Sequence, residues 1–200
     1  MTMLFAALLA AVVELQADPA HTTVSFSAKH MMITTVRGEF GKVASTLKWD
    51  KDDPTRSSVD FKAEVSSIDT RNEKRDAHLK SADFFDAQKC PEIAFKSTKI
   101  AKAGGDKYKV SGDLTMHCVT KPVTLDVTFN PNGVKSPWGT TVYAASAIGK
   151  VKRADWGLTW NKTLESGGVL VSDDIDIDAE IEYAQNPPAA KKEAQAETKK

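Results

Sequence analysis

The sequence predicts an all-β protein in which about eight antiparallel strands form a barrel and one short helix lies between the third and fourth strands. Three observations lead to this prediction. Apolar and polar residues alternate through most of the chain, as in strands with one dry and one solvated face. Turn-forming residues, such as Asp53-Pro54 and Gly104-Gly105, separate the alternating runs. A single internal segment, residues 72–81, has the polar pattern of a helix instead.

Three strands are predicted before the helix, at residues 21–30, 35–49 and 59–65. The third alternates in a single phase. The second changes phase, because Phe40 belongs to an even-numbered apolar set whereas Leu47 and Trp49 are odd-numbered. One extra residue is therefore expected near Gly41, as a β-bulge supplies.

Five strands are predicted after the helix, at residues 92–102, 106–118, 123–129, 139–152 and 169–183. The last is the clearest, because its odd positions are mostly apolar and its even positions from Asp174 onward are all acidic. Eight strands that close on themselves leave an interior that either fills with side chains or holds one small ligand. Two packed open sheets are the alternative architecture.

Both ends of the chain are predicted to lie outside the barrel, which is assigned to residues 18–184. Residues 1–17 are a candidate signal peptide, because the apolar run 4–13 is shorter than the roughly 20 residues of a membrane span and Leu15-Gln16-Ala17 offers a cleavage region. A buried N-terminal helix of a cytosolic protein is the alternative. Residues 185–200 are rich in Pro, Ala, Lys and Glu and lack aromatic residues, which predicts a disordered tail.

Charge and residue chemistry argue against several classes of function. The 27 basic and 27 acidic residues balance, so the chain lacks the excess of positive charge that a nucleic-acid binder needs. The four histidines (His21, His30, His78 and His117) show no close helical pairing and the two cysteines lack CxxC spacing, so no metal site is expected. No Ser or Cys nucleophile with a neighbouring base stands out, which argues against an enzyme.

The two cysteines are predicted to form a disulfide. A hairpin that turns at Gly104-Gly105 places Cys90 opposite or diagonal to Cys118, within the roughly 7 Å between Cα atoms that a disulfide allows. In an exported protein such a pair would oxidise. Two separate buried thiols are the alternative.

Four segments of the chain, taken in order, carry a resemblance to a known family. They are ADPAHTTVSFSAKHMMITTVRGEF, RDAHLKSADFFDAQKCPEIAFKST, GDLTMHCVTKPVTLDVTF and WGLTWNKTLESGGVLVSDDIDIDAEIEY. Their order and spacing resemble the successive blocks of the YceI-like proteins. The resemblance implies a lipocalin-like barrel, usually in the bacterial periplasm, whose interior holds a long isoprenoid chain such as a quinone tail or a related amphiphilic lipid. It implies binding and not turnover, since no catalytic residue is established for the family.

A barrel of this kind would line its cavity with inward-facing strand residues and with aromatic residues near its ends. The candidates are Phe26, Phe40, Phe61, Phe84, Phe85, Phe95, Leu114, Met116, Val127, Phe129, Trp156, Trp160 and Ile177. Each has a structural alternative, because an inward strand face is apolar whether side chains or a lipid fill the centre. For Phe84 and Phe85 the alternative is a plug at the barrel base, and for Trp156 and Trp160 it is burial in a tight turn.

Charged residues near predicted strand ends or bends are candidates to contact a lipid head group. They are His30, Arg37 and Arg153, with Lys29 beside them. The alternative for each is an ordinary charge on the exposed rim.

Together these expectations describe a non-catalytic protein, periplasmic or secreted, that binds, sequesters or transports an isoprenoid-type amphiphilic lipid. The expected ligand is a polyisoprenoid or a quinone, and no cofactor is expected. The expected partners are this lipid and, transiently, a membrane, whereas no nucleic acid is expected to bind. The chain is expected to be a monomer or a homodimer. The alternatives are an enzyme that acts on a small amphiphile inside the barrel and a stress-related structural protein with no ligand.

Overall fold

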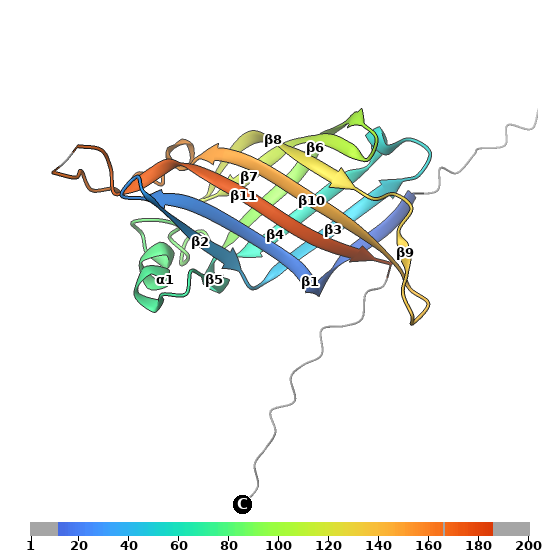
Figure 1. The fold of residues 1–200 in the computed structure, drawn as a ribbon, viewed down its shortest axis with the longest axis horizontal. Coiled ribbons are helices and arrows are strands. Elements are labelled where there is room, and N and C mark those ends of the chain that lie inside the picture. Colours follow the sequence, from blue (N-terminus) through green and yellow to red (C-terminus); the bar gives the residue numbers. More distant parts are fainter. Residues whose placement is uncertain (1–11, 166, 186–200) are drawn as a thin grey trace, which may run out of the picture.

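Eight long strands form the wall of a closed antiparallel barrel in the computed structural model, which describes residues 12–165 and 167–185 (Figure 1). These strands are β1 (Val12–His30), β3 (Val43–Asp50), β4 (Ser58–Glu64), β6 (Glu92–Gly104), β7 (Lys107–Met116), β8 (Val119–Phe129), β10 (Thr141–Lys152) and β11 (Val171–Ala184). Each pairs with the next in this order, and β11 pairs back with β1. The predicted eight-stranded barrel is confirmed.

Shorter elements connect the barrel strands. They are β2 (Thr34–Phe40), β5 (Ile68–Asp69), β9 (Val134–Lys135), the helix α1 (Glu73–Lys80) and the 3-10 helices η1 (Pro54–Arg56), η2 (Val65–Ser67) and η3 (Arg153–Trp156). The predicted helix is α1, which begins where the Asn72 side chain accepts the Arg75 backbone N–H at 3.0 Å. Within residues 12–165 and 167–185, none of the helices has the length and apolar character of a membrane span.

β1 begins earlier than predicted and is interrupted in its middle. Residues 12–16 pair with β3, whereas residues 25–30 pair with β2. Between them, residues 18–21 bulge from the ladder with β11, so the buried positions change from odd (Leu15) to even (Val24). The stretch 12–17, expected to end a leader, is thus part of the barrel wall. The preceding residues and the tail from 186 lie outside the described residues.

The predicted phase change near Gly41 separates β2 from β3. β2 ends at Phe40 and β3 begins at Val43, and both Phe40 and Leu47 are buried although one number is even and the other odd. The Gly41 N–H donates to the Ser67 carbonyl at 3.1 Å, which ties the break to η2. The irregularity lets β2 pair with the second half of β1 while its last two residues also pair with β5.

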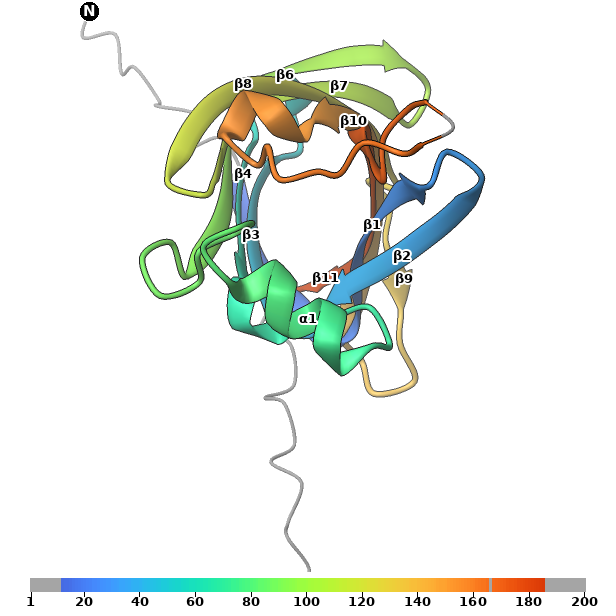
Figure 2. The same cartoon turned by 90° about the vertical axis from the view of Figure 1, so that its left-hand side faces the viewer.

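The two ends of the barrel differ. α1, η3 and the turn between β1 and β2 all lie at one end, on the left in Figure 1. Figure 2 looks along the barrel from this end, with α1 and η3 on opposite sides of the ring of strands. At the other end the Trp49 ring packs 4.6 Å from Phe129 and 6.2 Å from Tyr108, measured between ring centroids. All three rings are buried, so aromatic packing fills that end.

Candidate functional site

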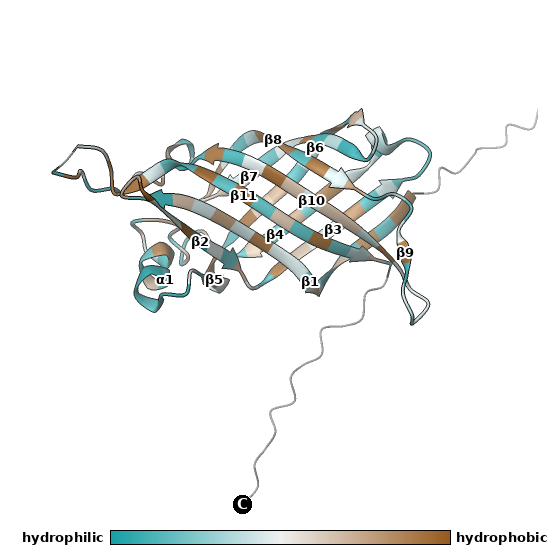
Figure 3. Cartoon of the chain, in the orientation of Figure 1, coloured by the Kyte–Doolittle hydropathy of each residue, from teal (hydrophilic) through white to brown (hydrophobic). Residues whose placement is uncertain are grey.

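The barrel encloses a cavity of about 250 Å³. All eight barrel strands contribute inward side chains to its wall, and nearly all of these side chains are aliphatic or aromatic. The inner wall is apolar because hydrophobic and hydrophilic residues alternate along the strands, as Figure 3 shows. Among the described residues that line the cavity, Arg153 is the one charged side chain. The compartment is therefore apolar, with a single cation.

Eleven of the thirteen residues predicted to line a cavity do line this one. They are Phe26, Phe40, Phe61, Phe84, Phe85, Phe95, Leu114, Met116, Val127, Phe129 and Ile177. The strand residues in this set have the inward phase that alternation predicts. The aromatic rings of this set pack against one another along the wall. The ring centroids of Phe26 and Phe40, for example, lie 5.6 Å apart, and the centre of the barrel stays vacant.

Trp156 and Trp160 differ from the prediction, because neither lines the cavity. Trp156 is 2% exposed, and its indole N–H donates to the Leu114 carbonyl at 3.0 Å, which holds the ring against β7. The Trp160 ring lies 4.7 Å from His78 and 5.3 Å from Phe84 between centroids. Both indoles therefore support the residues around the cavity without facing it.

Residues 73–91, which we call the lid, comprise α1 and the segment that follows it. Leu79, Phe84 and Phe85 of the lid line the cavity, whereas the other residues of α1 are polar except Ala77. The apolar cavity beside this segment thus explains why a short connection carries two adjacent phenylalanines. Phe84 is also buried between the cavity and Trp160, so it serves both as packing and as lining.

A disulfide between Cys90 and Cys118 ties the end of the lid to the turn between β7 and β8. Their Cα atoms lie 5.4 Å apart. The pairing of Phe95 with Leu114 in the β6–β7 hairpin sets this proximity. The predicted disulfide is confirmed, and a cross-link over 28 residues stabilises the fold by about 2–4 kcal/mol through the entropy of the unfolded chain.

Arg153 lies at the same end of the barrel as the lid and is 6% exposed. Its Nε donates to the Ser172 carbonyl at 3.0 Å and its Nη1 donates to the Leu158 carbonyl, while Nη2 has no protein acceptor among the described residues. Burial lowers the pKa of the guanidinium, an effect that the nearby Asp173 carboxylate opposes. Because an arginine remains protonated in proteins, the cavity wall carries a buried cation with an unused donor.

The other head-group candidates lie outside the cavity wall. His30 is the last residue of β1, paired with Val171, and it does not line the cavity. Arg37 borders a groove on the outer surface, because the even-numbered positions of β2 are the buried ones. Lys29 is exposed, and its Nζ donates to the Thr35 hydroxyl at 2.8 Å.

Small residues that the sequence-based prediction did not include shape the cavity. Ala145, Ala147 and Ala179 line it, where larger side chains would fill it. Gly112 has a different role, because a Cβ at this position would meet the Phe95 ring at 2.5 Å. A glycine inside a strand pattern marks such a close approach, and this signal was available in the sequence.

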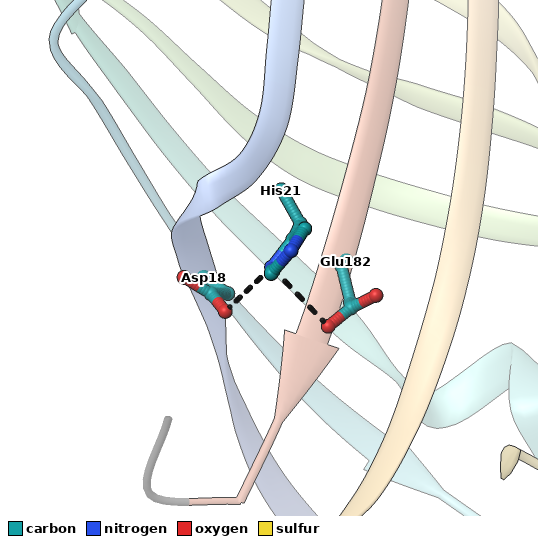
Figure 4. A group of neighbouring side chains, drawn as sticks. All are labelled: Asp18, His21 and Glu182. Atoms are coloured by element: carbon teal, nitrogen blue, oxygen red, sulfur yellow. Dashed lines mark hydrogen bonds and ion pairs between the residues drawn. The ribbon is translucent and has the colours of Figure 1, made fainter. Parts of the chain in front are cut away.

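A polar cluster at the β1 bulge joins Asp18, His21 and Glu182 (Figure 4). The His21 Nδ1 lies 3.0 Å from the Asp18 carboxylate and 3.8 Å from that of Glu182. Burial raises the pKa of Asp18, but hydrogen bonds from His21 and the Ala20 N–H outweigh it and lower the pKa. The hydrogen bond to Asp18, followed by the charge of Glu182, raises the pKa of His21.

The same three side chains offer metal-ligand atoms within 4.8 Å of one another, a grouping that the sequence did not predict. Both Asp18 oxygens already accept hydrogen bonds, one from the Ala20 N–H and one from His21. None of the three residues lines the cavity. Closure of the bulge therefore accounts for the cluster, and we assign it no further role.

The sequence and the fold both have known counterparts. A family model described as the YceI-like domain matches residues 15–183. A UPF0312 protein of Staphylococcus aureus, SAS2572, is 33% identical over 167 residues, which are 84% of this chain and 95% of the relative.

Two solved structures share the barrel. BcnA of Burkholderia cenocepacia is 26% identical with a TM-score of 0.73, over 83% of this chain and 98% of BcnA. A polyisoprenoid binding domain from Saccharophagus degradans, implicated in plant cell wall breakdown, has a TM-score of 0.63 over 87% of this chain and 99% of that domain. At 13% identity, this second likeness shows the fold alone.

Proposed function

The chain belongs to the YceI-like family, and from this premise we propose that it binds an isoprenoid-type amphiphilic lipid, a polyisoprenoid or a quinone, without turning it over. The tail occupies the barrel cavity and the head group lies at the mouth, the end of the barrel that carries the lid and Arg153. The protein thereby sequesters or transports the lipid.

One observation carries this proposal: the barrel interior is vacant and apolar, with one buried cation at its mouth. Each methylene moved from water into such a space contributes about 0.8 kcal/mol. Several isoprene units therefore offset the cost of immobilising the ligand, which is about 4–15 kcal/mol for association in general. The barrel shared with the polyisoprenoid binding domain from Saccharophagus degradans supports the same proposal.

Recognition of the head group is assigned to Arg153. Burial of a hydrocarbon tail discriminates poorly among tails, so specificity must come from polar groups. The unused Nη2 donor suits an oxygen acceptor, such as a quinone carbonyl or a phosphate, and a charged donor makes the stronger class of hydrogen bond. This arrangement favours a ligand with an oxygen-rich head and an apolar tail.

Binding is favoured over catalysis by the two tyrosines that line the cavity, Tyr108 and Tyr183, because burial raises the pKa of both hydroxyl groups. Ser45 and Tyr183 both line the cavity, and their hydroxyl oxygens lie 2.7 Å apart in a hydrogen bond. Burial raises the pKa of Tyr183 to about 12, although the Ser45 bond opposes the shift. Tyr183 and Arg153 therefore both stay protonated near neutral pH, and neither side chain can act as a general base.

An oxidising compartment, the periplasm or the cell exterior, is the location that we propose. The Cys90–Cys118 disulfide supports this location, because structural disulfides persist where thiols are not kept reduced. In that compartment the protein would carry an insoluble lipid inside its cavity from one membrane to another.

The proposal is tested on the full chain purified from membrane-containing cells. The protein is denatured, extracted with organic solvent, and the extract is analysed by mass spectrometry. We expect an isoprenoid lipid close to equimolar with the protein, and a rise in Tm when a polyprenyl quinone is added to delipidated protein. Repeated preparations without such a lipid, together with an unchanged Tm, would overturn the proposal.

Replacing Arg153 by methionine is expected to weaken binding of a polyprenyl quinone by about 10- to 150-fold. A hydrogen bond to a charged group is worth about 1.5–3 kcal/mol, which corresponds to that range. Squalene, which has an isoprenoid tail and no head group, should bind the variant as it binds the wild type. Titration with both ligands separates head-group recognition from damage to the mouth, and an equal loss for the two would contradict the assigned role.

A further inference from the structure

The turn between β1 and β2 carries three consecutive exposed apolar residues, Met31, Met32 and Ile33, which we call the mouth tip. Their exposed fractions are 43%, 64% and 78%. Met32 packs against Gly168, where a Cβ would stand 2.6 Å from the Met32 Sδ, yet all three side chains of the tip remain largely exposed. Three large apolar residues in sequence are unusual for a solvated turn.

The backbone of the mouth tip is a second anomaly. Met31 and Met32 both have positive φ, 51° and 64°, and the Ile33 N–H donates to the His30 carbonyl at 3.2 Å. Two central residues of positive φ are typical of a type I′ turn, for which Asn-Gly is the preferred sequence. Methionine is disfavoured at both positions, so the tip retains apolar side chains at the expense of turn stability.

The mouth tip lies at the end of the barrel that the proposed function makes the mouth. It connects β1 to β2 at the end of the barrel that carries the lid, on the left in Figures 1 and 3. The Met31 N–H donates to the Leu170 carbonyl at 2.7 Å, next to Val171, which lines the cavity. Val169, on the same segment, is a fourth exposed apolar residue. The mouth tip is thus tied by its backbone to the segment that enters the cavity wall at Val171.

We propose that the mouth tip inserts into the surface of a lipid bilayer and holds the mouth of the barrel against it, so that a lipid passes between membrane and cavity without crossing water. This inference rests on the proposed function and names the partner of the same site.

Position and charge favour a bilayer as the occupant. A hairpin tip with three exposed apolar side chains suits the headgroup boundary of a bilayer, where amphipathic segments bury their apolar face. Lys29 and Lys162 are exposed on the segments that meet at the tip, where their ammonium groups suit lipid phosphates. The acidic residues nearest to Val169 in sequence are Glu165 and Asp173, four positions away on either side. A carrier whose guest comes from a membrane needs this orientation.

The test replaces the tip by the residues that its backbone prefers, in the triple variant M31N/M32G/I33T. Because Asn-Gly suits two positive φ values, the variant should melt at or above the wild-type Tm. We expect its binding to phosphatidylethanolamine and phosphatidylglycerol vesicles, and its rate of polyprenyl quinone transfer from them, to fall by about tenfold through the lost apolar contact. Loading from detergent solution should be unchanged.

The matched control, V134T/W138S, removes two exposed apolar residues of the β9 region, at the opposite end of the barrel (Figure 1). It should behave as the wild type in every assay. The inference is overturned if the tip variant binds vesicles and transfers lipid like the wild type, or if the control loses as much. Failure of the wild type to load any isoprenoid from detergent contradicts the proposed function instead, and vesicle binding still reports on the tip.

Discussion

Replacing Ala147 by phenylalanine is expected to weaken lipid binding strongly while the barrel stays folded. Ala147 lines the cavity from β10, opposite Val127 on one side and Ala179 on the other. A phenylalanine ring in this position occupies the part of the cavity that we assign to the lipid tail. Displacing three or four methylenes, at about 0.8 kcal/mol each, weakens binding by about 100-fold or more.

The folded barrel should tolerate this ring, because the added side chain enters a vacant space and does not displace packed atoms. We therefore expect a Tm equal to that of the wild type or higher, together with loss of the polyprenyl quinone in titrations monitored by tryptophan fluorescence. Ala144→Phe is the matched control, since Ala144 is exposed on the same strand. Equal affinity of the two variants would contradict a ligand site inside the barrel.

The strands were predictable because each one buries a single face, which leaves a period of two in the sequence. The same periodicity predicted the disulfide, since the hairpin that pairs Phe95 with Leu114 also brings Cys90 beside Cys118. The bulge near Gly41 was visible as a change of parity. These features depend on local pattern and on one turn, which a sequence contains directly.

The vacancy of the barrel centre was not predictable, because it depends on a sum of volumes over all strands. Phe61 has the same pattern whether its ring faces other rings or empty space, and the volumes of the other inward residues, including small ones such as Ala147, decide which it is. Trp156 and Trp160 were misplaced because they lie in a segment without a period. The position of each ring depends on its contacts with another segment, as with the Leu114 carbonyl.

The N-terminal boundary is the largest difference from the sequence-based prediction. The apolar run of residues 4–13 continues directly into Leu15 and Ala17, so the start of β1 looks like the end of a leader. The bulge at residues 18–21 then breaks the alternation that would have joined this stretch to the rest of the strand. Composition alone cannot separate the two.

A chain that begins at Asp18 is expected to lose the cooperative folding of the barrel. Residues 12–16 form the ladder with β3, and the fully buried Leu15 packs in the core beside Val13. Burial of two such side chains contributes about 3–6 kcal/mol, before the lost hydrogen bonds are counted, against a typical total stability of about 5–15 kcal/mol. Thermal unfolding followed by circular dichroism should show no sharp transition.

A chain that begins at Val12 retains the whole ladder and is the control, with an expected Tm close to that of the full chain. The contrast bears on export, because a cut after Ala17 would remove part of the wall, including the Leu15 side chain at the end of the barrel that Trp49 and Phe129 fill. If, as expected, the chain that begins at Asp18 fails to fold, a leader that is removed is cut before Val12. A sharp transition near the full-chain Tm for the protein that begins at Asp18 would instead restore residues 15–17 as the cleavage region.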